Sequence, residues 1–182
     1  MFPANQVHVM IDFETLGLRP NANIRSLGAV VFSPYFLPLE ESFHQATNLD
    51  LPQYRRCIDP DTWAWWKQQE AEGNPMPTGQ YYLQDVANNF RAWLHAQCPQ
   101  PENLFIWSNG TDFDIPLLYS MFDDCNLTPN WNYNNVRDYR TLRKLFPNIA
   151  VPEFIGVKHV AVDDAWNEAK HCVEILNYVG TL

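Results

Sequence analysis

The stretch VHVMIDFE, residues 7–14, constrains the fold most strongly because apolar residues recur at every second position. Side chains alternate between the two faces of a β-strand, so this period predicts a strand with one buried face that includes Ile11 and Phe13. Asp12 and Glu14 then lie together on the opposite face. Two carboxylates at this spacing can reach one cation, although a solvated strand face has the same pattern.

The segments that follow predict further strands. The turn-rich LGLRPNAN precedes the apolar run SLGAVVF at residues 26–32, and this connection is too short for a crossover helix. The first two strands are therefore expected to be antiparallel. A third strand is expected around residues 41–47, and the short apolar run NLFIWSN at residues 103–109 predicts a buried strand.

Five segments have helical signals. The first offers Asp61 as an N-cap, and Pro116 fits the first turn of the third, where its missing N–H does no harm. Apolar residues recur at intervals of three and four in the second and the last. The segments are residues 59–73, 84–98, 113–125, 137–146 and 164–178. With the strands, this order favours an α/β fold with a mixed β-sheet flanked by α-helices.

Length and composition predict one folded domain over residues 1–182. Hydrophobic residues make up 46% of the chain and charged residues only 18%, which argues against disorder. No stretch approaches the ~20 apolar residues of a membrane span, and the N-terminus lacks a signal-peptide pattern, so a cytoplasmic protein without a membrane partner is expected. The four cysteines lack zinc-site spacing and are expected to be reduced thiols.

The net charge of -9 disfavours broad, nonspecific contact with nucleic acid. A negative surface repels phosphate and lacks the counterion release that a basic face provides. Any nucleic-acid partner must therefore be held locally. Clustered carboxylates that bind divalent cations could do this, because bound metal inverts the local sign of charge.

Two further motifs carry acids where helices are expected to begin. Asp114 in NGTDFDIPLL follows the apolar run, at the sheet edge where α/β proteins concentrate their chemistry. An ordinary helix cap is the alternative role of Asp114, and Asp112 could provide that cap instead. His159 and Asp164 lie in KHVAVDDAWNEAKHC, where a surface histidine and a plain N-cap at Asp163 or Asp164 are the alternatives. Each motif alone is weak. Their order along the chain, after the two acids of the first strand, makes them specific.

With these three motifs the chain resembles the DnaQ-like (DEDD) 3'-to-5' exonucleases of the ribonuclease H-like fold, in the subgroup whose third motif carries histidine (DEDDh). The stretches DFETLG, SLGAVVF, DPDTWAWWKQQ, WSNGTDFD and RDYRTL are similar to the branch of phage exonucleases and mycobacterial-type exoribonucleases. The resemblance spans nearly the whole chain. It implies a ribonuclease H-like mixed sheet flanked by helices.

The resemblance assigns metal binding to four acids and proton transfer to one histidine. His159 matches the general base, and histidine can accept a proton from water near neutral pH. Asp164, five residues later and followed by Ala165, matches the last acid, which leaves Asp163 dispensable. Oxygen ligands suit two Mg²⁺ or Mn²⁺ ions, roughly 3.5–4 Å apart, for phosphodiester hydrolysis. The four acids are Asp12, Glu14, Asp114 and Asp164.

The same resemblance implies the substrate and the partners. Nucleoside 5'-monophosphates are expected to be released from single-stranded or frayed 3' ends of RNA or DNA. Thr15, Leu16 and Gly17 are expected near the terminal nucleotide, where Leu16 is either a hydrophobic wedge or a packing residue. Small stand-alone relatives often form homodimers, so a homodimer is an expectation too.

Several roles stay open at the level of sequence. Adjacent helix positions point about 100° apart, so at most one of Trp65 and Trp66 readily faces the substrate, and Trp66 is the one expected in the core. Arg140 is expected to contact either a phosphate or a neighbouring acid. The alternative functions are a catalytically idle protein-binding module and a phosphohydrolase of small nucleotides. Sequence alone does not separate RNA from DNA as substrate.

Overall fold

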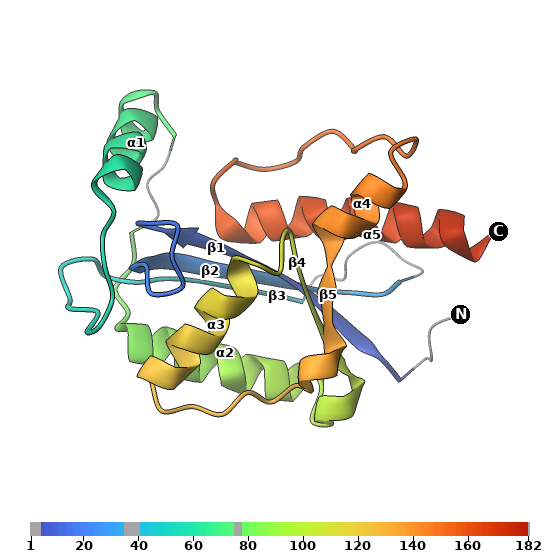
Figure 1. Ribbon diagram of the computed structural model, residues 1–182, viewed down its shortest axis with the longest axis horizontal. Helices are drawn as coiled ribbons and strands as arrows, with labels where there is room; N and C mark the ends of the chain where they lie inside the picture. The colour runs from blue at the N-terminus through green and yellow to red at the C-terminus, as the bar shows by residue number, and fades with distance from the viewer. Residues whose placement is uncertain (1–4, 35–40, 75–77, 182) are drawn as a thin grey trace.

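The computed structural model describes residues 5–34, 41–74 and 78–181, which contain a mixed five-stranded sheet flanked by helices (Figure 1). The strands are β1 Val7–Thr15, β2 Ile24–Phe32, β3 Ser42–Ala46, β4 Leu104–Ser108 and β5 Val136–Asp138. Their order in the sheet is β3-β2-β1-β4-β5. β1 is antiparallel to β2 and parallel to β4, β2 is antiparallel to β3, and β4 is parallel to β5. The predicted α/β fold and the antiparallel first pair are confirmed.

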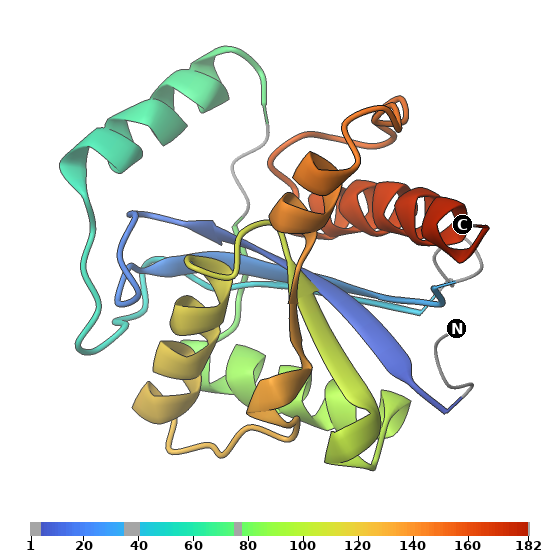
Figure 2. The ribbon, with the colours of Figure 1, turned by 45° about the vertical axis from the view of Figure 1, so that its right-hand side comes forward.

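The helices form layers on both faces of this sheet. α2 and α3 cover one face, α4 and α5 cover the other, and α1 stands beyond the end of β1 (Figures 1 and 2). The helices are α1 Pro60–Ala71, α2 Leu83–Gln97, α3 Asp114–Asp124, α4 Tyr139–Leu145 and α5 Ala161–Gly180, with 3₁₀ turns at Pro101–Asn103 and Tyr133–Asn135. The position of α1 leaves it overhanging the strand end that carries the predicted acids.

The alternation in β1 divides its side chains between two hydrophobic cores. Ile11 and Phe13 pack in the core that includes α2 and α3, and Ile11 is fully buried. Met10 packs in the core that includes Ala165 and Ala169 of α5. Asp12 and Glu14 share the parity of Met10, so they lie on the α5 side. The two-residue alternation of β1 therefore places Asp12 and Glu14 on the side of the sheet that α5 covers.

The first and third helices differ in how well their starts were predicted. α1 begins at Pro60 and its N-cap is Asp59, whose Oδ2 accepts a hydrogen bond from the backbone N–H of Thr62 at 3.1 Å. The prediction of Asp61 as N-cap is therefore wrong, because proline occupies the first helical position, where no N–H is needed. Pro116 lies in the first turn of α3, as predicted.

Other helix starts lack a side-chain cap. The N-cap of α3 is Phe113, not Asp112, and Oδ1 of Asp112 lies 3.6 Å from Nη1 of Arg140 instead. Of the two contacts predicted for Arg140, a phosphate or a neighbouring acid, the structure thus shows the acid. α5 begins at Ala161, before the predicted 164–178 segment, after the N-cap Val160. Because Val160 makes no side-chain capping bond, the sequence carries no capping signal for the start of α5, whereas Pro116 marks the start of α3.

A short strand, β5, replaces the first part of the helix predicted over residues 137–146. Asp138 ends this strand and caps α4, since its Oδ1 accepts a hydrogen bond from the backbone N–H of Thr141 at 2.6 Å. The third strand predicted around residues 41–47 is present as β3. The four cysteines are free thiols, as their spacing predicted. Within the described residues, no helix has the length and hydropathy needed to cross a bilayer.

Candidate active site

Close packing of α5 on the sheet brings the third sequence motif to the first. Asp12 on β1 pairs with Gly28 on β2. A Cβ atom at Gly28 would lie 2.2 Å from backbone atoms of Ala161 and Val162, so only glycine lets the first turn of α5 rest directly on β2. A register shift follows in β1 between Glu14 and the next residue. Such irregularities recur beside active sites, where they re-aim side chains.

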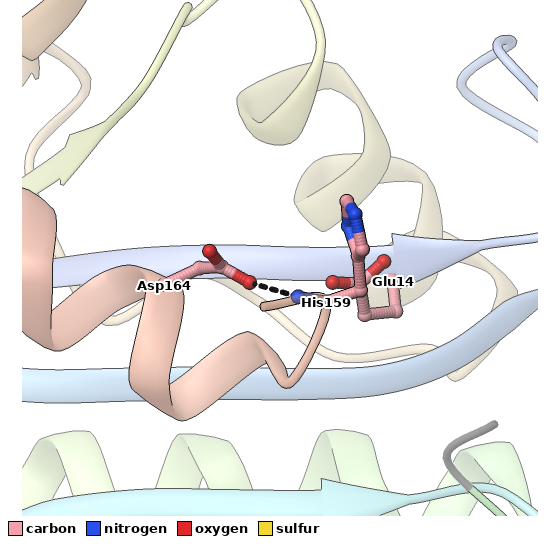
Figure 3. Close-up of side chains that lie close together, drawn as sticks. All are labelled: Glu14, His159 and Asp164. Carbon is pink, nitrogen blue, oxygen red and sulfur yellow. Dashed lines mark hydrogen bonds between the residues drawn. The ribbon is translucent and has the colours of Figure 1, made fainter. Parts of the chain in front are cut away.

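The two adjacent aspartates of α5 hold the loop that precedes this helix. Oδ2 of Asp164 accepts a hydrogen bond from the backbone N–H of His159 at 2.8 Å (Figure 3). Oδ2 of Asp163 accepts one from the backbone N–H of Val157 at 2.8 Å. Neither aspartate is the N-cap, because the cap is Val160. The alternative of a plain N-cap at either residue is therefore wrong.

The backbone of His159 has a left-handed conformation, with φ of 63°. Histidine adopts this region more readily than most residues other than glycine, but the conformation still carries strain. Strained backbone of this kind is concentrated at functional sites. Here the bond to Asp164 helps to keep the strained residue in place.

Asp114, the first residue of α3, is positioned by the loop between β4 and α3. Asp138 fixes this loop because its Oδ2 accepts a hydrogen bond from the backbone N–H of Thr111 at 2.7 Å. Arg140 donates a second bond, from Nη2 to the carbonyl oxygen of Asn109 at 2.6 Å. Asp114 itself is buried. α4 and β5 thus brace the loop that ends at the acid.

Burial raises the pKa of all four acids of the three motifs, and neighbouring carboxylates add to this for Asp12 and Glu14. Burial, and then the neighbouring Glu14, raise the pKa of Asp12 well above its usual value. Burial and Asp164 raise the pKa of Glu14 to about 8, although Arg25 acts in the opposite direction. Burial raises the pKa of Asp114 to about 7, and burial also raises that of Asp164. Negative charge at this site is therefore destabilised unless a cation neutralises it.

The donor atoms of this site fit a divalent metal. One ligand atom each from Glu14, His159 and Asp164 lies within 4.8 Å of the others, and Figure 3 shows the three side chains together. Asp12 interacts electrostatically with Glu14, Asp114 and Asp164. The structure thus brings three of the five predicted residues within 4.8 Å of one another, and Asp12 and Asp114 interact with them electrostatically. Carboxylate oxygens are the ligands that Mg²⁺ and Mn²⁺ prefer. The negative charge of the clustered carboxylates would also attract such an ion.

A hollow of about 500 Å³ opens beside Glu14 and below α1. Trp65 is 39% exposed and its ring lies 4.9 Å from that of His159. Trp66 is 1% exposed, and its Nε1 donates a hydrogen bond to the carbonyl oxygen of Thr15 at 2.8 Å. Trp66 therefore anchors α1 to the end of β1, as its predicted core position requires, while Trp65 faces the hollow. The hollow is lined by Phe13, Glu14, Thr15, Leu18, Asp59, Asp61, Thr62, Trp65, Trp66 and Phe113.

The segment after the first motif is divided between packing and the hollow. Thr15 lines the hollow, but the side chain of Leu16 is 1% exposed. Leu16 is therefore a packing residue, and its burial does not fit the alternative role of a hydrophobic wedge against the nucleotide. Leu18 is 79% exposed and does line the hollow. Gly17 lies between these residues, and a Cβ there would meet that of Asp59 at 3.3 Å.

Three residues near the site were not singled out from the sequence. Leu18 and Phe113 line the hollow but belong to common loop and strand-end patterns. Glu168 lies one turn after Asp164 on α5, and among the described residues its buried Oε2 has no hydrogen-bond partner. The spacing of four residues from Asp164 was the available signal for Glu168.

A mixed sheet with this order, and carboxylates gathered from its first strand, the start of α3 and the first turn of α5, agree with the ribonuclease H-like fold of the DnaQ-like exonucleases. The exonuclease family that the three motifs predicted is confirmed by the match to a sequence model. The sequence model of the 3'-5' exoribonuclease Rv2179c-like domain matches residues 7–176, and the chain belongs to that family.

Individual relatives agree with this class. The chain is 28% identical over 126 residues to an exodeoxyribonuclease of Enterobacteria phage T4, which covers 63% of this chain and 55% of the phage protein. E. coli exonuclease I in complex with a 5cy-dA13 oligonucleotide superposes with a TM-score of 0.65 at 16% identity, over 97% of this chain and 43% of that one. Its zinc-bound complex with single-stranded DNA gives a TM-score of 0.65 at 16% identity, over 97% and 40%. The chain thus spans about half the length of these relatives or less.

Proposed function

We propose that this protein is a metal-dependent 3'-to-5' exonuclease of the DEDDh type, which releases nucleoside 5'-monophosphates from single-stranded or frayed 3' ends. The observation that carries the proposal is the meeting of Glu14, His159 and Asp164, from segments far apart in the chain, within one 4.8 Å cluster. Membership in an exoribonuclease domain family supports the same reaction. A catalytically idle module would have no need to keep these groups together at the cost of burying their charges.

Asp12, Glu14, Asp114 and Asp164 would hold two Mg²⁺ or Mn²⁺ ions. When bound, two such ions neutralise the anionic phosphodiester, lower the pKa of the attacking water and stabilise the leaving 3' oxygen. The protein's own contribution is to fix these four carboxylates on the sheet, on α3 and on α5. Burial, and then repulsion between neighbouring carboxylates, raise the pKa of Glu14 and Asp12, so a bound cation would stabilise the charged cluster.

His159 would accept the proton of the attacking water. Its ring lies within the cluster, and its backbone is fixed by Asp164, so a ligand-binding residue also positions the base. The edge-on ring of Trp65, 4.9 Å away at 89°, limits where the imidazole can turn. Proton transfer by a placed base contributes typically 10²–10⁴-fold to a rate.

The hollow beside Glu14 would take the terminal nucleotide. Trp65, Phe113 and Leu18 give it apolar walls, on which a base can stack without sequence preference. A site of about 500 Å³ holds the end of a strand rather than a long duplex. This local grip agrees with the net charge of -9, which opposes wide contact with phosphates. Thr15 and Gly17 would lie along the terminal sugar.

The decisive experiment uses 5'-end-labelled single-stranded RNA and DNA with purified protein and Mg²⁺. A ladder that shortens from the 3' end, with nucleoside 5'-monophosphates as product, is expected for at least one of the two sugars. The variant His159→Asn is expected to lose turnover by roughly 10²-fold or more. Asparagine is preferred to alanine because it tolerates the left-handed backbone of residue 159, so loss of activity then reports the imidazole.

The alternatives give different results in the same assay. Folded protein that binds metal but shortens neither polymer would contradict the proposal. Hydrolysis of small nucleotides without polymer cleavage would indicate a phosphohydrolase. The phage relative is an exodeoxyribonuclease and the matching family is one of exoribonucleases, so both sugars are needed. The predicted homodimer is tested separately by light scattering coupled to size-exclusion chromatography.

A further inference from the structure

Glu168 lies at the edge of the carboxylate cluster without a role in the proposed reaction. It follows Asp164 by four residues on α5, and residues at this spacing share one face of a helix. The start of α5 rests on β2 at Gly28, the partner of Asp12. The face that carries Asp164 and Glu168 therefore looks toward the acids of β1.

The Glu168 carboxylate is buried with one oxygen unused. Oε2 makes no hydrogen bond within the part of the chain that the structure describes. Burial, then Asp114 and Asp164, raise the pKa of Glu168 to about 8, while Asn109 and Arg143 act in the opposite direction. A buried acceptor without a partner costs about 1–3 kcal/mol, and more for a charged group. The side-chain hydrogen bond from Asn109 therefore leaves one carboxylate oxygen of Glu168 unused.

Glu168 also lines a hollow that is separate from the one beside Trp65. A second hollow, of about 300 Å³, is lined by Glu168 and Asp164. Its remaining walls come largely from α4 and from the loop before α5, including Tyr139, Arg143 and Lys158. The carboxylate cluster therefore borders both hollows, through Glu14 on β1 and through Asp164 and Glu168 on α5.

We propose that Glu168 is a fifth carboxylate of the metal centre, whose free Oε2 helps to hold the divalent cation bound by Asp12, Asp114 and Asp164. The inference rests on the proposed metal site, which names four acids only. Its distinctive consequence has two parts. Removing this charge weakens metal binding, and it also relieves repulsion in the metal-free protein. A glutamate that merely supported the fold would show neither effect.

The test measures Mn²⁺ affinity and thermal unfolding of the full chain, without reference to activity. Titration calorimetry at one fixed pH compares the wild type with Glu168→Gln, which keeps the shape and loses the charge. An affinity loss of about 10–100-fold is expected. In EDTA above about pH 8, where the Glu168 carboxylate is charged, the same variant is expected to unfold at a higher temperature than the wild type. Glu174→Gln, further along α5, is the matched control and is expected to change neither quantity.

The outcomes separate this inference from the proposed function. If the wild type binds no Mn²⁺, both fail. If Asp164→Asn loses Mn²⁺ affinity but Glu168→Gln matches the wild type, Glu168 is not part of the metal centre, while the proposed site stands. A lower unfolding temperature of Glu168→Gln in EDTA, with unchanged affinity, would make Glu168 a counter-ion of Arg143. Glu168→Asp retains the charge and is expected to keep more Mn²⁺ affinity than the glutamine variant.

Discussion

The two faces of the sheet differ in what they bury. The face covered by α2 and α3 packs as a continuous apolar cluster, in which Phe90 of α2 and Leu118 of α3 are fully buried. The face covered by α4 and α5 also contains polar groups in its core. There Oη of Tyr139 lies 2.7 Å from Nδ1 of His171, and the carboxylates gather where this face meets the end of β1.

The contrast shows how one strand serves stability and chemistry at once. Alternate residues of β1 face the two sides, so Ile11 is fully buried in the apolar cluster while Asp12 lies among carboxylates. Burial of Ile11 stabilises the fold. Burial of Asp12 destabilises its charged form, and this is tolerated at a functional site. Substitutions on the α5 face should therefore lower turnover more than stability, and substitutions on the α2 face should lower stability more than turnover.

The largest effect is expected for Asp164→Asn on the α5 face. Loss of one carboxylate at the proposed metal centre would remove several kcal/mol of charge stabilisation, so turnover should fall by roughly 10³-fold or more. Unfolding in EDTA should occur at the same or a higher temperature, because burial already raises the pKa of this acid. Activity assays with a parallel melting curve check both parts. Retained turnover would remove Asp164 from the metal centre.

The opposite signature is expected for Phe90→Ala on the α2 face. Truncating a fully buried phenylalanine costs about 3–5 kcal/mol of unfolding free energy, because it leaves a cavity. Turnover of the folded fraction should change by less than about twofold, since Phe90 lies in the cluster on the other side of the sheet from α5. Denaturant unfolding and assays well below the melting temperature measure the two quantities. A large loss of turnover in fully folded variant would show that the faces are not independent.

The α5 face should also make stability depend on pH. Glu14 and Glu168 have their pKa raised to about 8 and Asp114 to about 7, so the folded protein binds more protons than the unfolded chain above about pH 4.5. Unfolding free energy of metal-free protein must therefore fall as pH rises from about 4.5 to about 8. We expect a loss of at least about 2 kcal/mol, or ~4–8 °C in Tm.

Melting curves in EDTA across this range test the pH dependence. Mg²⁺ or Mn²⁺ should restore stability, and more so at pH 8 than at pH 5, because metal binds the deprotonated carboxylates. The difference between Phe90→Ala and wild type should stay constant with pH, since that variant changes no titrating group. Metal-free stability that rises between pH 5 and pH 8 would contradict the electrostatic description of the site.

Much of this arrangement could be predicted because it depends on local periods and on motif order. The alternation in β1 assigned Asp12 and Glu14 to one face without any knowledge of the partner helix. The start of α5 could not be predicted, because Val160 makes no side-chain capping bond. Leu16 and Leu18 are both apolar, and only the fold decides that one is buried and the other exposed. Glu168 was missed because a single glutamate on a long helix is usually solvated.

A smaller effect is expected for Trp65→Ala in the hollow. Stacking of a base on an aromatic side chain is worth about 1–3 kcal/mol, so KM for an oligonucleotide should rise by about tenfold with a smaller change in kcat. Phe90→Ala is the control, because it lowers stability from the other face of the sheet and should leave KM nearly unchanged. Equal KM for Trp65→Ala and wild type would place the terminal base elsewhere.

The smallest effect is expected for Asp163→Asn. This variant tests whether Asp163 and its neighbour Asp164 have different roles on α5. Asp163 supports the loop before α5, where its Oδ2 accepts the backbone N–H of Val157, and an asparagine Oδ1 can accept the same bond. Asn167 holds the loop independently, since its side chain bonds both the N–H and the carbonyl oxygen of Ile155. Turnover of Asp163→Asn should therefore remain within about threefold of the wild type. If this variant loses metal-dependent cleavage while Asp164→Asn retains it, the assignment of the two aspartates must be exchanged.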